Sequence, residues 1–334
     1  MSEITNPHDK FFKEVFTRRD TAEEFFLNYL PEDVVKLIDL DSLEYTKDSF
    51  IDEHLKEYFS DLLFKVYLRD GSLGYIYILF EHKSYQDPLT AFYILRYMVK
   101  IWEMSLKSGT ATGFPVIIPL VLYHGDKSWR TGINFRDLFD YPKDMHLFIP
   151  DYQYVLWDAS RYSDDEIKGE AILRVALLIL KYIFKEDLRG RLSGILMLLK
   201  DLSKKRTGLE YIEAILKYIV NAAPTGNISY EDLRVAVDEA LPDKGGEIMP
   251  TIADTLREEG MQQGVQQGVQ QGMLEDAREA VIDILEMRFD VAPQSIIKII
   301  NGIDDISILK SLRRKAVKAI SLDEFMKILD SIMK

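Results

Sequence analysis

The sequence contains no cysteine and no long apolar run. Without cysteine, its 334 residues cannot form a disulfide framework. The longest apolar stretch, FPVIIPLVLY at 114–123, is too short for a spanning helix, which needs about 20 apolar residues. The N-terminal MSEITNPHDKFF lacks the basic segment and apolar segment of a secretory signal. We therefore expect a cytoplasmic globular protein with no membrane partner.

A basic arm is also missing. The formal net charge is −13 at pH 7, with 42 Lys and Arg against 55 Asp and Glu. Proteins that bind DNA gain much of their affinity by neutralising phosphates with Lys and Arg. If DNA is the partner, the contact must come from a local basic surface, and binding must be weak and sensitive to salt.

Hydrophobic periodicity predicts an α/β core with a mixed sheet over residues 1–160. Period-two alternation on both sides of a glycine-containing turn predicts a β-hairpin in YFSDLLFKVYLRDGSLGYIYILFEHKS. Around it we expect two helices in 7–30, a helix in 87–109 opened by Asp87 and Pro88, and strands at 114–123 and 152–158.

The remainder of the chain has a helical pattern. We expect a helical extension over 161–255, then a repeat helix and C-terminal helices over 256–334. The repeat GMQQGVQQGVQQGM places glycines at every fourth position from Gly260 to Gly272. Each glycine costs a helix about 0.5–1 kcal/mol relative to alanine, so the segment is either a flexible linker or a helix that packs closely against another. We favour a helix that pairs with its copy in a homodimer.

Ionisable residues interrupt the hairpin where its second strand should end. Alternation puts Leu62 and Phe64 on one face of the first strand and Asp61 on the other; in the second strand Glu81 and Lys83 also lie opposite the apolar face. Close carboxylates stay ionised together when a divalent cation lies between them, and oxygen ligands favour Mg²⁺ or Mn²⁺. The arrangement predicts metal-assisted hydrolysis of phosphodiesters. Charged residues at strand ends are also common without any function.

Four ordered motifs carry a resemblance to a known family. They are HDKFFKEVF at 8–16, YFSDLLFKVYLRDG at 58–71, YILFEHKSYQDPLTAFYILRYMVKIWE at 77–103 and PVIIPLVLYHGDKSW at 115–129. Together they resemble the YhgA-like family of recombination-promoting nucleases and transposases, within the PD-(D/E)XK nuclease superfamily. The resemblance covers roughly residues 6–160 and implies a restriction-endonuclease-like core.

The resemblance also implies roles for individual residues. Asp61 matches the metal-binding aspartate of the superfamily, Glu81 the acidic residue of its second motif, and Lys83 its catalytic lysine. Many relatives carry glutamine at the position of Lys83, so this chain matches the wider superfamily better there. Ser60 stands where the motif name has proline, a position that varies widely.

Several further residues are candidates with a structural alternative. Asp9 or Glu14 could supply an extra carboxylate from the first helix, although an aspartate at a helix start is often a cap or a dipole partner. By resemblance Gln86 and Arg96 would line the site, or they lie at a helix start and on a solvated face. Lys127 and Arg130 could contact a DNA backbone. The sequence thus predicts an Mg²⁺-dependent DNA endonuclease linked to recombination or transposition; the alternative is a non-catalytic DNA-binding or assembly protein with the same fold.

Overall fold

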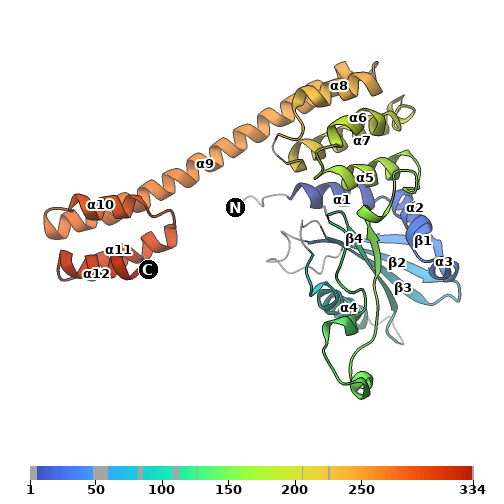
Figure 1. Ribbon diagram of the computed structural model, residues 1–334, viewed down its shortest axis with the longest axis horizontal. Coiled ribbons are helices and arrows are strands. Elements are labelled where there is room, and N and C mark those ends of the chain that lie inside the picture. Colours follow the sequence, from blue (N-terminus) through green and yellow to red (C-terminus); the bar gives the residue numbers. More distant parts are fainter. Residues whose placement is uncertain are drawn as a thin grey trace. The chain divides into compact units, whose positions relative to one another are not determined.

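The computed structural model describes residues 6–47, 59–81, 86–107, 113–125, 127–204, 206–224 and 226–332. The chain divides into two compact units, Met1–Ala253 and Asp254–Lys334. The first unit contains a five-stranded sheet with helices on both faces, and the second consists of helices (Figure 1). The predicted class, a mixed α/β fold followed by a helical region, is confirmed.

The sheet has the order β1-β2-β3-β4-β5. Its strands are β1 (Ile38–Thr46), β2 (Phe59–Leu68), β3 (Leu73–Glu81), β4 (Val116–Tyr123) and β5 (Val155–Asp158). The first three strands pair antiparallel, whereas β3, β4 and β5 run parallel. The parallel pair β3 and β4 is joined through helix α4 (Thr90–Lys107), as a parallel connection requires a crossover.

The predicted hairpin is present as β2 and β3. Asp70 and Gly71 form its turn: Asp70 Oδ1 accepts a hydrogen bond from the Ser72 amide at 2.8 Å, and Gly71 has a φ of 86°. A side chain is strained at that φ, which explains the glycine. Strand β1 was not predicted, because it carries carboxylates at positions 39, 41 and 44 and its register with β2 slips between Asp39 and Glu44.

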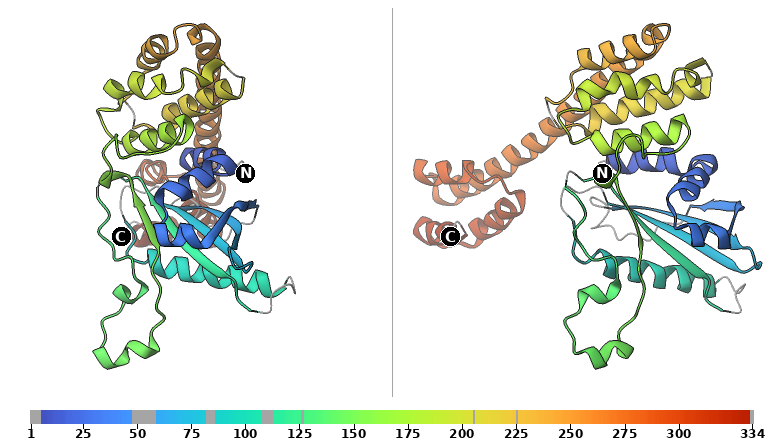
Figure 2. Two further views of the ribbon diagram at one scale, coloured as in Figure 1. Left: turned by 90° about the vertical axis from the view of Figure 1, so that its right-hand side faces the viewer. Right: turned by 45° about the vertical axis from the view of Figure 1, so that its right-hand side comes forward.

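Helices cover both faces of the sheet (Figure 2). On one face lie α1 (Pro7–Phe16) and α2 (Arg19–Tyr29), followed by the short α3 (Glu32–Leu37). Phe12 of α1 stacks on Phe80 at 4.3 Å between ring centroids, and Phe26 of α2 meets Phe64 edge-on at 5.4 Å. The opposite face packs against α4. The hairpin therefore has two apolar faces, whereas alternation indicated one, and Asp61 lies on the face covered by α4.

A long connection and a group of helices complete the first unit. The connection between β4 and β5 contains the 3₁₀ helices η2 (Phe135–Leu138) and η3 (Lys143–Phe148). After β5 come η4 (Ala159–Arg161), α5 (Ala171–Tyr182), α6 (Leu188–Met197), η5 (Leu202–Lys204), α7 (Arg206–Ala222) and α8 (Tyr230–Ala240). Helix α1 joins them to the sheet, because Phe11 stacks on Tyr218 of α7 at 4.1 Å.

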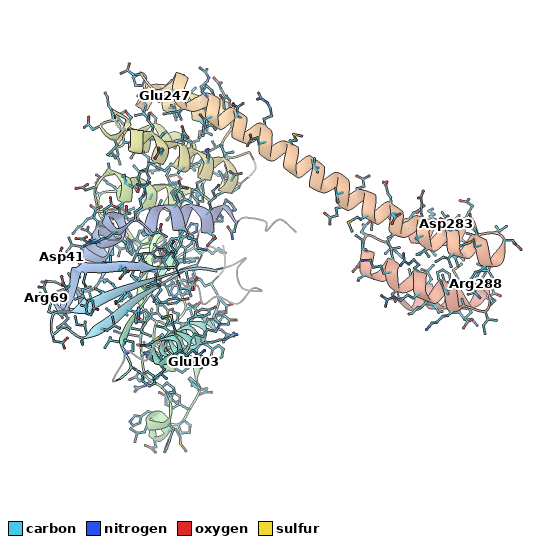
Figure 3. The ribbon with its side chains drawn as sticks, turned by 180° about the vertical axis from the view of Figure 1, so that it is seen from behind. Asp41, Arg69, Glu103, Glu247, Asp283 and Arg288 are labelled. Atoms are coloured by element: carbon cyan, nitrogen blue, oxygen red, sulfur yellow. The ribbon has the colours of Figure 1, made fainter. Side chains whose placement is uncertain are left out.

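Helix α9 (Gly245–Phe289) begins in the first unit and continues into the second. In the second unit its C-terminal part forms an apolar core with α10 (Gln294–Asn301), α11 (Ile306–Lys318) and α12 (Leu322–Ile332). Arg288, labelled in Figure 3, donates to the Ala316 carbonyl oxygen of α11 at 2.8 Å and also to that of Val317. Contacts from α9 therefore fix the C-terminal end of α11.

The glycine repeat is helical along its whole length within α9. Side chains of Met261, Val265, Val269 and Met273 form a period-four stripe, each more than half exposed. No described atom lies within 4 Å of a Cβ built on Gly264, Gly268 or Gly272, the neighbouring helix backbone aside. Within the described chain, nothing packs on these glycines, so self-pairing stays a prediction.

Candidate active site at the end of the hairpin

Asp61 is a buried carboxylate in the middle layer of the first unit. It is the third residue of β2, pairs with Leu79 of β3, and is 3% exposed. The phenol of Tyr77 donates a hydrogen bond to its Oδ2 at 3.3 Å. Leu63 and Leu79 belong to the apolar cluster beneath α4 on this face. Because an ionised carboxylate is costly to bury, this position calls for compensating partners.

Tyr77 holds the orientation of this carboxylate. Its phenol is fully buried, and burial first, then the negative charge of Asp61, raises the pKa of Tyr77 well above its usual value. The phenol therefore stays protonated at neutral pH and remains a donor to Asp61. The ring of Tyr97 from α4 lies 5.7 Å from that of Tyr77. The donor is thus fixed between the sheet and the helix.

Glu81 is the last residue of β3. Its backbone pairs with Phe59 of β2 and Tyr123 of β4, and it lies two residues beyond Leu79, the partner of Asp61. Positions 61 and 81 are therefore diagonal neighbours on adjacent strands, a relation with a Cα separation of about 7–8 Å. The side chain of Glu81 lies outside the described part of the chain, as does the whole of Lys83.

The predicted metal ligands fit a hard cation by chemistry. Both Asp61 and Glu81 carry oxygen donors, which Mg²⁺ and Mn²⁺ prefer. Among described side chains, no group of three or more His, Cys, Asp or Glu could hold a metal ion. The Glu81 carboxylate lies outside the described side chains. A site made by these residues would therefore rest on Asp61 together with groups at the end of β3.

Gln86 contacts the loop that follows β4. Its Nε2 donates to the Ser128 carbonyl oxygen at 2.6 Å, and its Oε1 accepts from the Arg130 amide at 2.6 Å. Its amide is thus occupied by the backbone, so in this structure Gln86 positions the loop. The loop presents Lys127 and Arg130 to solvent, while Trp129 is buried. The structure brings Gln86 together with the two residues predicted to contact DNA.

Asp158 holds the same loop from the other side and was not singled out in the sequence. It ends β5 and is buried; its Oδ2 accepts from the Trp129 amide at 2.8 Å, and its Oδ1 accepts from the Ser160 amide and hydroxyl at 3.0 and 2.8 Å. Register places Glu81, Tyr123 and Asp158 in one row at the carboxyl ends of three parallel strands. A carboxylate directly after an apolar strand, the signal that pointed to Glu81, also marks Asp158.

The remaining candidates lie on helices. Asp9 is on the first turn of α1. The ring centroid of its neighbour His8 lies 5.3 Å from that of His124, and the His124 ring stacks on Phe80 near the end of β3. Asp9 is therefore near the end of the sheet at which β3 ends. Its carboxylate forms an ion pair with Lys13 at 2.8 Å, and Asn6, not Asp9, caps the helix. Glu14 is exposed on α1. Neither is brought to Asp61, since α1 covers the other face of the sheet.

Arg96 lies on α4, the helix that covers the Asp61 face. It is partly buried but is not among the residues through which α4 packs on the sheet, such as Ile94, Tyr97 and Ile101. The structure therefore places Arg96 on the helix that covers the Asp61 face, as predicted for a residue lining the site.

Comparison with known proteins identifies the family. The model of the family described as "Putative transposase, YhgA-like" matches residues 6–210. The chain belongs to this family. The match begins at the start of α1 and ends within α7, so the family region includes the sheet and much of the helical part of the first unit. The resemblance found in the four motifs is thereby confirmed. No solved structure matches the chain.

Three curated relatives align with this chain over most of their length. Recombination-promoting nuclease RpnA of Escherichia coli K12 is 33% identical over 257 residues, which is 77% of this chain and 85% of that protein. Nuclease RpnD of E. coli O157:H7 is 33% identical over 217 residues, 65% of this chain and 82% of its own. The inactive recombination-promoting nuclease-like protein RpnE of E. coli K12 is 31% identical over 290 residues, which is 86% of this chain and 93% of that protein. In the part of the chain that the structure describes, no helix has the length and apolar character needed to cross a membrane.

Proposed function

We propose that this YhgA-like protein is a metal-dependent DNA endonuclease that acts in recombination. The observation that carries the proposal is the buried Asp61 carboxylate, one diagonal step from the strand end at Glu81, with Lys83 two residues further along. The curated relatives named as recombination-promoting nucleases support DNA cleavage as the activity.

In this proposal Asp61 and Glu81 hold Mg²⁺ or Mn²⁺, and Lys83 orients the attacking water or neutralises charge developing on the phosphate. The ion, when bound, polarises a phosphodiester oxygen and lowers the pKa of a bound water. Tyr77 keeps Asp61 in one orientation through its hydrogen bond. Water adds to phosphorus, the bond to one sugar oxygen breaks, and that oxygen leaves with a proton.

Lys127 and Arg130 are proposed to contact the DNA backbone. Both are exposed in the loop after β4, and Gln86 and Asp158 restrain the backbone between them. Such contacts position a duplex without reading its sequence. Because the whole chain carries a charge of −13, we expect this contact alone to be weak and sensitive to salt.

Plasmid nicking tests the proposal. Purified protein should convert supercoiled plasmid to nicked or linear DNA with Mg²⁺ or Mn²⁺ and should not do so in EDTA. Asp61→Ala and Glu81→Ala should abolish cleavage, and Lys83→Ala should lose cleavage while retaining metal binding. Cleavage by Asp61→Ala at the parental rate in the same Mg²⁺ would mean that the site is elsewhere.

A second function has support from the relatives. RpnE is named as inactive although it aligns with 86% of this chain, so the family contains non-catalytic members. A protein of that kind would bind or assemble on DNA without cutting it. Metal-independent DNA binding with no cleavage under any tested metal would favour this alternative; metal-dependent cleavage excludes it.

We also propose that the protein forms a homodimer through the repeat in α9. The stripe from Met261 to Met273 is exposed and uncharged, and the adjacent glycines leave room for a second helix to approach closely. Two copies would supply two hydrolytic sites, as a double-strand break requires. Light scattering should give a dimer for the full chain and a monomer for a version ending before Gly260. The same oligomeric state in both versions would show that the repeat is not the dimer interface.

A further inference from the structure

Helix α11 is a local concentration of positive charge in an acidic protein. Its 13 residues, ISILKSLRRKAVK, contain five Lys or Arg and no Asp or Glu. The chain as a whole has a net charge of −13. The helix is thus the kind of local basic surface that an acidic DNA-binding protein would need.

The apolar and basic residues of α11 occupy different faces. Leu309, Leu312 and Ala316 are buried in the core of the second unit. The exposed side chains include Lys310, Arg313, Arg314 and Lys318. At 100° per residue these four cations fall on one face; three of them, at steps of four residues, form a row about 12 Å long. This basic face, defined by residues 310, 313, 314 and 318, runs along the exposed side of the helix.

The four cations of the basic face form no ion pair with the described carboxylates. None of the four lies within salt-bridge distance of a described carboxylate, whereas Arg278 in the same unit pairs with Asp304 at 2.7 Å. Asp276 of α9 lines the same shallow hollow as Lys310 and Arg313, so one edge of the face carries a negative neighbour. The other two cations lie away from that hollow.

Stabilisation of the helix itself explains only part of this charge. Lys315 and Lys318 lie in the last turn of α11, where cations interact favourably with the helix dipole. Lys310, Arg313 and Arg314 lie in the body of the helix, outside that turn, and neighbouring cations at three- and four-residue steps repel each other. An external polyanion would offset this repulsion.

We propose that the basic face of α11 binds the phosphate backbone of DNA, independently of sequence. The inference rests on the proposed function, because it takes DNA as the substrate. Duplex DNA carries one phosphate charge per about 1.7 Å of helix axis when both strands are counted, so several phosphates lie within the length of a row about 12 Å long. The side chains are long, flexible and without a shaped pocket, which suits backbone contact and not base reading.

The test compares two full-length variants with the same reduction of positive charge. The test variant carries Lys310→Gln, Arg313→Gln, Arg314→Gln and Lys318→Gln. The control carries Arg69→Gln, Lys107→Gln, Lys200→Gln and Lys298→Gln, all at exposed positions outside α11. Binding to a 30-base-pair duplex is measured in EDTA over a range of salt concentrations, and circular dichroism checks that both variants remain folded.

The slope of log K against log salt should fall in magnitude by about 0.9 for each phosphate that the protein no longer neutralises, hence by up to about 3.6 in the test variant. The control should keep most of the parental slope. Equal slopes in the parent and the test variant would overturn the inference, even where the parent cuts DNA with Mg²⁺. A parent that neither binds nor cuts DNA would overturn the proposed function as well, so the two failures are distinguishable.

Discussion

Replacing Asp61 by asparagine should separate a metal ligand from a structural carboxylate. Asparagine keeps the shape of the side chain, and its carbonyl oxygen can still accept the hydrogen bond from Tyr77. The substitution removes the charge and one of the two carboxylate oxygens. If Asp61 serves a metal, the fold should tolerate this change better than the activity does.

The expected change in stability follows from the burial of Asp61. Removing a carboxylate of 3% exposure from water costs several kcal/mol. The hydrogen bond from Tyr77, at 3.3 Å, is long and returns about 1 kcal/mol. Asp61→Asn removes this burial cost and keeps an acceptor oxygen for Tyr77, so the free energy of unfolding in EDTA should change by less than about 2 kcal/mol in either direction. Cleavage should be abolished.

Urea unfolding with and without Mg²⁺ is the assay. A ligand that binds only the folded protein adds about 2.7 kcal/mol at 100 times its dissociation constant. The parent should show a gain of this kind on addition of Mg²⁺, and Asp61→Asn should show none. Both proteins are measured in EDTA first, so that the effect on the bare fold is known.

Asp158→Asn is the matched control. Asp158 is 1% exposed and accepts hydrogen bonds from the Trp129 amide and from Ser160 through its two oxygens. Loss of one acceptor oxygen should cost about 2–4 kcal/mol, with the Mg²⁺ response kept. A decrease of about 2 kcal/mol or more by Asp61→Asn in EDTA, together with a parent that does not respond to Mg²⁺, would show that Asp61 is structural and refute the reasoning.

Three further predictions concern the surroundings of the site. Gln86→Ala removes both hydrogen bonds to the loop after β4 and should cost about 1–2 kcal/mol in urea unfolding and weaken DNA binding; unchanged binding would separate that loop from DNA. Phe12→Ala should cost about 3–5 kcal/mol, because this fully buried ring stacks on the sheet, and a cost below about 1 kcal/mol would contradict the packing. Burial raises the pKa of Asp164, but hydrogen bonds from Lys181 and Tyr182 have the larger combined effect and leave that pKa below its usual value of 3.8. The stability that this carboxylate contributes is therefore fully present above pH 3.8 and is lost as the pH falls through the lowered pKa. Because the Asp164 side chain is 36% exposed and solvent screens its charge, the difference in unfolding free energy between the parent and Asp164→Asn should be about 1 kcal/mol at pH 7. This difference should shrink in acid, and a difference independent of pH would exclude the charge as its cause.

The sequence predicted the hairpin because its alternation is local. Period two in β2 and β3 fixes which residues share a face, and the turn at Gly71 fixes which residues are opposite, so positions 61 and 81 fall on neighbouring strands at one end. Alternation could not show that α4 covers the face of Asp61, because that burial depends on residues about 30 positions away. The depth of the carboxylate was therefore missed, although its place in the strand was predicted.

Other features were missed for different physical reasons. Strand β1 is an edge strand whose carboxylates and register slip hide its alternation. The contact of Gln86 with the loop after β4 joins a side chain to backbone groups more than 40 residues away, and backbone partners leave no pattern in a sequence. The basic residues of α11 can be read from the sequence, but only the fold shows that four of them share an exposed face.

Helix α1 has a consequence for how the protein can be divided. Phe12 on one side of the helix stacks on the sheet, while Phe11 on another side stacks on Tyr218 of α7, and His8 Nδ1 lies 2.9 Å from the Tyr218 hydroxyl. A fragment ending at residue 160 would leave Phe11 facing water and would lack the helix against which this side of α1 packs. An excised fragment intended for crystallisation or gene fusion should therefore extend to Ala253, where the first compact unit ends.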